Sequence, residues 1–465
     1  KKAYKYDPSN DTAKNLVKRL SGQSSLGVTG LKAHELMLEG DQYVRQGDCQ
    51  SAQAHYKSAF EIDKKLGIAA YKAGKCLWEV SFSTEAIEWM KKAIFADPKL
   101  IDAYIQLADF YSQRFNFIAA AQTLNGASRI APKSHEVFRG FALVELRRKN
   151  PKAAIGFSKQ ALGIYSNDVD SMVILSEAYL LGRTNTQEAF AQAAKAIEID
   201  SSHRKAQIVY AKALARLQGA EFGIEHLETL ISRYPLVEDY RLALGRLYIS
   251  DDRFASAESV FRQLVDIQDK KKESLLELGR VLKIQGQFQE ALDSFYKAAV
   301  YDPADAEPFY EAGKLLLEFK KPKEARQQFE RVLVTNPKYP LVHYNIGKTE
   351  LMLKRPKKAI EQADKEKRAN PNLAAAYMLA AEAYAKMKQF NLCAQEYQKA
   401  IKLRPQGADS YVRAAACYRQ AGNFDSAESM LNIASRKESG NSDIYREQGA
   451  LFEAKGDYEK AIAAY

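Results

Sequence analysis

The feature that most constrains this chain is a pattern of small residues and proline that recurs every 34 residues. Numbered from the start of each unit, small residues stand at positions 8, 20 and 27, and proline stands at position 32. The unit from residue 67 shows them as Gly74, Ala86, Ala93 and Pro98, and the unit from residue 272 as Gly279, Ala291, Ala298 and Pro303. A single globular core rarely grows to 465 residues, so an open-ended repeat array accounts for the length.

Aromatic residues complete the pattern at positions 11 and 24. Tyr179 and Tyr384 stand at position 11, and Phe295 and Phe329 at position 24. This combination resembles the tetratricopeptide repeat (TPR) family. The resemblance implies an all-α fold, a right-handed superhelical solenoid of antiparallel helix pairs, A and B. In such a fold small residues let A and B approach closely, aromatic residues fill the space between pairs, and proline ends helix B.

The period divides the chain into an array at 33–465 and a preceding segment at 1–32. Twelve full repeats start at residues 33, 67, 101, 135, 169, 204, 238, 272, 306, 340, 374 and 408, and a partial one starts at 442. The fifth repeat carries one extra residue at its internal turn, near Thr184 and Asn185. Residues 1–32 are predicted to hold the tail of an earlier repeat and then a hinge or an irregular helical join, of which we favour the join. We expect the array to continue beyond both ends.

Motifs for catalysis, metal binding or nucleotide binding are missing from the sequence. The six histidines make no paired ligand set. Gly347, Lys348 and Thr349 look like the end of a phosphate-binding loop, but Val342 stands where its first glycine belongs, and the segment falls inside a predicted helix. We therefore expect no enzyme activity, no cofactor and no metal site.

The four cysteines form no CxxC pair and no zinc-ligand spacing with histidine. We expect Cys49, Cys76, Cys393 and Cys417 to be small buried apolar groups that do not fix the redox compartment.

The compartment follows only weakly from these residues. No run of about 18 apolar residues predicts a membrane span, and no leader opens the chain at Lys1. These two observations favour the cytoplasm. Oligomeric state has no sequence signal here.

The formal net charge is +11, and the positions of the basic residues within the repeat are more informative than this total. The TPR resemblance implies that helix A lines a concave groove, with position 9 among those that meet ligands. Along the chain position 9 carries Asp41, Lys75, Asp109, Leu143, Glu177, Lys212, Arg246, Arg280, Lys314, Lys348, Glu382 and Ala416. The five consecutive basic residues predict a basic ladder roughly 40 Å long, if equivalent helices lie about 10 Å apart.

Two interpretations of the basic ladder remain open. Lys212, Arg246, Arg280, Lys314 and Lys348 could bind an acidic partner segment. Alternatively, Asp239, Glu273 and Glu307 at position 2 could pair with the ladder across repeats and make it structural. Exposed ion pairs contribute only about 0–1 kcal/mol each, so stability gives weak reason for such a run.

Aromatic residues accompany the ladder in two adjacent repeats. Tyr310 and Tyr344 precede Lys314 and Lys348 by one helical turn, and Asn345 follows Tyr344. An aromatic ring beside a cation suits a peptide with acidic groups. The rival interpretation is that these side chains pack within the groove.

The sequence thus predicts a non-catalytic scaffold whose groove holds other proteins, with acidic or extended segments as ligands. The alternative is a regulatory or substrate-recruiting TPR arm of a larger enzyme or of a bacterial motility or envelope assembly machine. Nucleic acid is disfavoured because acidic residues interrupt the basic positions. Residues 356–371 carry Ala363 and Glu366 where large apolar and small residues are expected, which predicts a weak spot or a polar docking edge.

Overall fold

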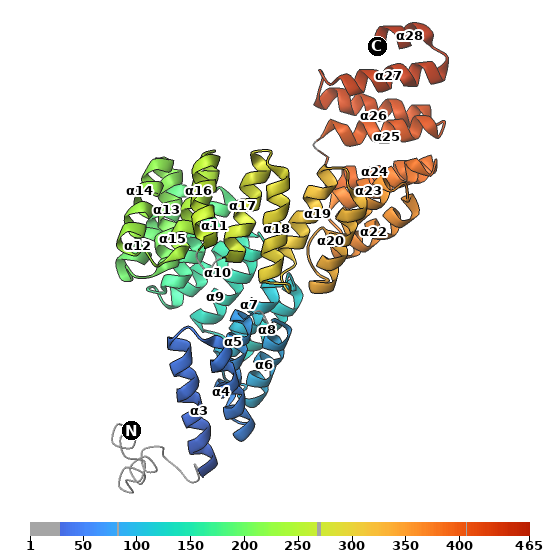
Figure 1. The fold of residues 1–465 in the computed structure, drawn as a ribbon. Coiled ribbons are helices and arrows are strands. Elements are labelled where there is room, and N and C mark those ends of the chain that lie inside the picture. Colours follow the sequence, from blue (N-terminus) through green and yellow to red (C-terminus); the bar gives the residue numbers. More distant parts are fainter. Residues whose placement is uncertain (1–27, 81–82, 267–270, 406) are drawn as a thin grey trace. The chain divides into compact units, whose positions relative to one another are not determined.

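The computed structural model describes residues 28–80, 83–266, 271–405 and 407–465, which form helices joined by short turns (Figure 1). Contacts divide the chain into two compact units, Lys1–Lys270 and Lys271–Tyr465. The described residues contain no strand, so the all-α class expected from the sequence is confirmed. Most of the segment expected at 1–32 lies outside the described residues.

Odd-numbered helices correspond to helix A of each repeat and even-numbered helices to helix B. In the first unit they are α3 (Val28–Arg45), α4 (Cys49–Ile62), α5 (Gly67–Glu79), α6 (Ser83–Ala96), α7 (Ile101–Gln113), α8 (Phe117–Ile130), α9 (His135–Arg147), α10 (Pro151–Ile164), α11 (Val169–Gly182), α12 (Thr186–Ile199), α13 (Arg204–Gln218), α14 (Ala220–Arg233), α15 (Glu238–Ser250) and α16 (Phe254–Asp266). In the second they are α17 (Lys271–Ile284), α18 (Phe288–Tyr301), α19 (Glu307–Glu318), α20 (Pro322–Thr335), α21 (Val342–Met352), α22 (Pro356–Ala369), α23 (Ala374–Lys386), α24 (Phe390–Leu403), α25 (Ala408–Gln420), α26 (Phe424–Lys437), α27 (Ser442–Lys455) and α28 (Tyr458–Ala464).

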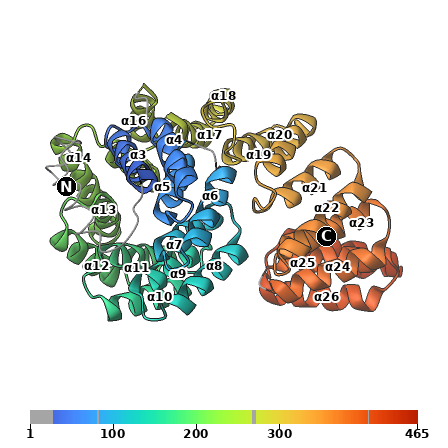
Figure 2. The ribbon, with the colours of Figure 1, turned by 90° about the horizontal axis from the view of Figure 1, so that it is seen from below.

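Within each unit every helix packs on the next along the chain, and several A helices also touch the following A helix, as α11 does α13 and α21 does α23. Figure 2 shows this for the first unit, where the helices from α7 to α14 follow one beside the next. Equivalent positions of neighbouring A helices therefore lie on the same side of a unit.

The turn between helices A and B uses a left-handed residue at position 15 of the repeat. Glycine fills it at Gly47, Gly286, Gly422 and Gly456, with φ near 80° in each. Phe115, Lys149, Asp252, Lys320, Lys354 and Lys388 adopt the same conformation with φ of 55–60°. A side chain in this region costs on the order of 1 kcal/mol, so these six turns are locally strained.

The small residue at position 8 is required by the aromatic ring at position 24 of the same repeat. A Cβ atom placed on Gly279 would lie 2.5 Å from the Phe295 ring, and one on Gly313 would lie 2.7 Å from the Phe329 ring. Gly40 with Tyr56, Gly245 with Phe261 and Gly449 with Tyr465 repeat this contact. Both Phe295 and Phe329 are fully buried, so this contact forms the centre of the A–B packing.

In the repeat that starts at residue 340, the space over the glycine at position 8 is filled by a different residue. Its position 24 is Ala363, which leaves no ring to cover Gly347. Leu379 of the following helix α23 fills the space, with its Cδ2 atom 2.5 Å from where a Cβ on Gly347 would lie. This repeat therefore takes part of its core from its neighbour.

The expectation that the cysteines are isolated apolar groups is wrong for Cys393 and Cys417, which form a disulfide between α24 and α25. Cys49 and Cys76 are free thiols. The Cys49 thiol donates a hydrogen bond to the Cys76 sulfur at 3.0 Å. Cys393 and Cys417 are separated by 24 residues in the sequence, and Cys49 and Cys76 by 27. The packing of helix B on the next helix A brings each pair together, and a search for CxxC spacing does not detect such pairs.

Candidate functional site

The five predicted basic residues at position 9 divide between the two units. Lys212 on α13 and Arg246 on α15 belong to the first, and Arg280, Lys314 and Lys348 on α17, α19 and α21 belong to the second. The structure thus describes the basic ladder as two separate groups. Their surroundings differ from one member to the next.

Arg280 is held by carboxylates on two helices. Its guanidinium pairs with Glu277 one turn earlier, Nη1 to Oε1 at 3.1 Å, and with Glu307 at position 2 of the next repeat. Burial alone would lower the pKa of Arg280, but the carboxylates of Glu277 and Glu307 outweigh it and raise that pKa. At Arg280 the contacts therefore favour the structural interpretation.

Lys314 is also neutralised, but within its own helix. Its Nζ lies 3.0 Å from Oε2 of Glu311, whose side chain is largely buried. The same Nζ stands 5.4 Å from the centre of the Tyr310 ring. Little of this charge is left for a ligand unless Glu311 is displaced.

Lys348 differs from Arg280 and Lys314. It is exposed, and within the described residues no carboxylate lies in ion-pair range of its Nζ. The Nζ stands 5.8 Å from the ring centre of the half-buried Tyr344. Burial raises the pKa of Tyr344, and the charge of Glu382 on the next A helix adds to the effect. Lys348 and Tyr344 thus present an uncompensated cation beside an aromatic ring.

The two other residues predicted to contact a partner in the second unit are buried. Tyr310 is 9% exposed and Asn345 is 8% exposed. The Asn345 amide donates to the Tyr310 hydroxyl and to the Leu341 carbonyl, each at 3.0 Å. Burial raises the pKa of Tyr310 to about 12, with the Asn345 hydrogen bond acting in the opposite direction. These contacts join α19 to α21 and favour the packing interpretation for both residues.

In the first unit Lys212 is half-buried, and no ion pair to it occurs among the described residues. Burial lowers the pKa of Lys212, against the attraction of Glu177. Repulsion by Arg246 lowers it further. Glu177, Lys212 and Arg246 occupy position 9 of three consecutive repeats, so their side chains gather on one side of the unit.

The polar helix α22 contains a contact that the sequence analysis missed. Glu366 is 2% exposed, which excludes a docking role for this side chain. Its Oε2 accepts the backbone N–H of Tyr344 at 3.1 Å, and its Oε1 accepts the Asn370 amide at 2.6 Å. The carboxylate therefore supports the start of α21, the helix that carries Tyr344 and Lys348.

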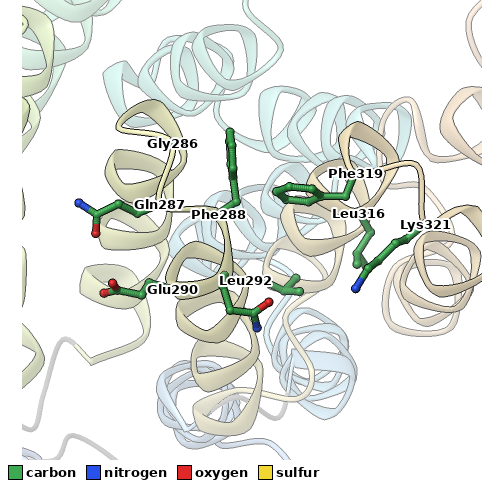
Figure 3. Close-up of a pocket in the computed structure, with 9 residues that line it drawn as sticks. Gly286, Gln287, Phe288, Glu290, Leu292, Leu316, Phe319 and Lys321 are labelled. Carbon is green, nitrogen blue, oxygen red and sulfur yellow. The ribbon is translucent and has the colours of Figure 1, made fainter.

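A pocket of about 470 Å³ lies in the second unit, near the turns between helices A and B (Figure 3). Phe288 and Phe319 meet edge to face there, with ring centres 4.8 Å apart. Leu292 and Leu316 form its apolar floor, and Lys321 lies at its edge. None of the predicted partner-binding residues lines this pocket.

Across the described residues no cluster of three or more histidine, cysteine or acidic side chains could hold a metal ion. Among these residues no helix has the length and apolar character that a membrane crossing requires.

Comparison with protein families gives matches along most of this array. Three models, each described as tetratricopeptide repeat, match residues 282–344, residues 37–101, 242–308 and 417–465, and residues 374–406. The chain belongs to the tetratricopeptide repeat family. TPR arrays of this kind are protein-interaction scaffolds, and this chain is one whose partners are proteins.

Comparison with solved structures gives matches at low sequence identity. Yeast Tom70 is 16% identical, with coverage of 93% of this chain and 96% of that chain and a TM-score of 0.43. Cut9–Hcn1 of the APC/C is 12% identical, with 93% and 96% coverage and a TM-score of 0.42. YrrB, described as a TPR protein with an unusual peptide-binding site, is 20% identical over 40% of this chain and 95% of that chain, with a TM-score of 0.35. Among curated proteins no match was found.

Proposed function

We propose that this TPR scaffold binds acidic segments of partner proteins through the A-helix surface of each unit, without a catalytic step. In the second unit the contact residues are Lys348 and Tyr344. In the first unit they are Lys212 and Arg246. Arg280 and Lys314 border the surface and act mainly as structural ion pairs, while Tyr310 and Asn345 support the helix beneath it.

The observation that carries the proposal is the uncompensated charge of Lys348. Exposed ion pairs add only about 0–1 kcal/mol to stability, so an exposed lysine without a partner adds less still. A cation over an aromatic ring is a good receptor for a carboxylate whose apolar stem rests on the ring. Glu366 and Asn345 hold α21 in place from the buried side, so the receptor is preorganised.

Lys212 supports the same interpretation in the first unit. A half-buried ammonium whose pKa is lowered by burial gains from a carboxylate ligand, because the ligand replaces hydration that the ammonium has lost. The charge of Glu177 opposes the shift, but among the described residues Glu177 and Lys212 form no ion pair. An acidic ligand would therefore find a positive site in each unit.

The test is selection of a random peptide display library on the intact chain, followed by sequencing of the retained peptides. The wild-type chain is expected to enrich peptides rich in aspartate and glutamate. Lys348→Glu and Lys212→Glu together should abolish that enrichment. Affinities of the best peptides, measured by fluorescence anisotropy, should fall about tenfold or more for the double variant, as loss of a charge-assisted contact implies.

Matched controls separate specific binding from net charge. Lys358→Glu and Lys365→Glu make the same charge change on the exposed side of α22. They should leave enrichment of acidic peptides in place. If the wild-type chain enriches no acidic peptides, or if the two pairs of variants lose them equally, the proposal is wrong.

A further inference from the structure

The four cysteines of the chain form two pairs, and each pair crosses from helix B of one repeat to helix A of the next. In each pair one cysteine lies on helix B and the other at position 10 of the following helix A. Cys393 on α24 is joined to Cys417 on α25, with Cα atoms 6.0 Å apart. Cys49 lies at the start of α4, three positions earlier in its repeat than Cys393, and its sulfur atom is 3.0 Å from that of Cys76 on α5.

Cys49 departs from what other repeats carry at its position, whereas Cys76 shares position 10 with Cys417. Cys49 opens helix B at position 17, where phenylalanine and proline are usual, as at Phe117, Pro151, Phe288, Pro322, Phe390 and Phe424. Position 10, the place of Cys76, holds a fully buried alanine at Ala178, Ala213 and Ala383. Neither position requires a cysteine for packing, so the contact between the two sulfur atoms is a feature that the repeat pattern does not demand.

We propose that Cys49 and Cys76 close into a second inter-repeat disulfide by exchange with a small-molecule disulfide such as glutathione disulfide. A disulfide has a sulfur separation of about 2.05 Å, so the two thiols at 3.0 Å need to approach by about 1 Å. Cys49, at the first residue of α4, can make this movement by side-chain rotation and a small shift of the helix end.

The reaction balances as two successive exchanges. The Cys49 thiolate attacks one sulfur of the small disulfide, forms a mixed disulfide and releases one small thiolate. The Cys76 thiolate then attacks the Cys49 sulfur, the protein disulfide forms, and the second small thiolate leaves. Two protein thiols are oxidised, one small disulfide is reduced to two thiols, and the thiol protons pass to water or to the released thiolates.

The surroundings set the order of these exchanges. Cys49 is half-buried and within reach of a small molecule, whereas Cys76 is 3% exposed. Burial raises the pKa of the Cys76 thiol, and its hydrogen bond with Cys49 adds to the increase. Cys49 is therefore the entry thiol and Cys76 the resolving one.

Closure would tie together two helices already linked by a polar contact. Asp41 on α3 accepts the Tyr56 hydroxyl at 2.7 Å and the Lys72 ammonium at 2.5 Å. Tyr56 is on α4 and Lys72 is on α5, so the same two helices meet Asp41. The disulfide would join α4 to α5 covalently, so these two helices could no longer separate from each other.

The experiment uses the full chain, reduced with dithiothreitol and then exposed to glutathione disulfide. Thiols that remain are blocked with N-ethylmaleimide after unfolding, and intact mass and peptide mapping locate them. We expect all four thiols to be consumed, with no glutathione left attached and a peptide pair joined through Cys49 and Cys76. Amides of α4 and α5 should then exchange hydrogen about tenfold more slowly, or slower still, than in the reduced chain.

Two variants make the outcome decisive. Cys49→Ser should leave Cys76 reactive to maleimide while the Cys393–Cys417 disulfide still forms. Cys76→Ala introduces the residue found at position 10 of other repeats, so it should fold, and its α4 amides should exchange alike under both conditions. The proposal is overturned if Cys49 and Cys76 both stay reactive, if Cys49 stops at the glutathione adduct, or if the link joins two chains.

Discussion

The carboxylate of Glu366 accepts a hydrogen bond from the backbone N–H of Tyr344 at 3.1 Å. Tyr344 lies in the first turn of α21, where backbone N–H groups have no partner within the helix. The N-cap residue of α21 is Leu341, which offers no side-chain acceptor. Glu366 therefore supplies from the neighbouring helix the cap that the local sequence lacks, and its negative charge also suits the helix N-terminus.

Replacement of Glu366 by alanine should destabilise the second unit by about 1–3 kcal/mol, because buried donors lose their acceptor. Glu366→Gln keeps one oxygen acceptor and should cost less. Hydrogen exchange of the α21 amides, measured with the urea midpoint, checks this prediction. Equal losses for the two variants would mean that the hydrogen bond to Tyr344 contributes little.

Lys354 occupies the left-handed position of its turn with φ of 58°. Lys354→Gly removes the side-chain strain and should raise the free energy of unfolding by a few tenths to about 1 kcal/mol. Lys365→Gly makes the same change inside helix α22 and should lower stability by about 1 kcal/mol. Chemical denaturation of both variants tests the prediction, and a loss of stability for Lys354→Gly would contradict it.

Gly279 and Gly156 should respond in opposite ways to alanine. A Cβ on Gly279 would lie 2.5 Å from the Phe295 ring, so Gly279→Ala should destabilise by about 1–3 kcal/mol. Gly156 lies inside α10 with nothing within 4 Å of the added atom. Gly156→Ala should therefore stabilise by about 0.5–1 kcal/mol through helix propensity. Thermal unfolding of the two variants distinguishes these outcomes.

His226 should make the first unit sensitive to mild acid. Burial lowers its pKa below the ordinary 6.5, and the ring Nε2–H donates a hydrogen bond to the Gln207 amide oxygen at 2.9 Å. Below pH 6.5 the unfolded chain binds a proton that the folded chain resists, so stability falls as pH falls through that window. Below pH 6.5 the free energy of unfolding should fall less for His226→Gln than for the wild type. At higher pH it should change with pH in the same way for both proteins. Urea denaturation across a pH series measures both slopes.

The fold was predictable because packing is repeated inside each 34-residue unit. Gly279 and Phe295 lie in one repeat, and their places at positions 8 and 24 recur along the chain. A period of this kind identifies which residues share a helix face and which end a helix. The family assignment followed from the same residues.

The site was less predictable because its decisive contacts cross from one repeat to another. Asn345 reaches the Tyr310 hydroxyl of the preceding repeat, and that contact withdraws both residues from the surface. Arg280 meets Glu307 of the following repeat. Position 9 indicates on which side of helix A a basic side chain lies. It does not indicate which acidic residue lies opposite that side chain. The remaining charge of Lys348 could be recognised only after those pairs were placed.

The contact of Leu379 with Gly347 limits how freely this array can be rearranged. Repeats such as those that start at residues 272 and 306 carry their own ring over position 8, so they could be moved, deleted or duplicated as units. The repeat that starts at residue 340 takes its cover from the next helix A. Its sequence is therefore tied to the repeat that follows it, and recombination at residue 373 would separate two halves of one core.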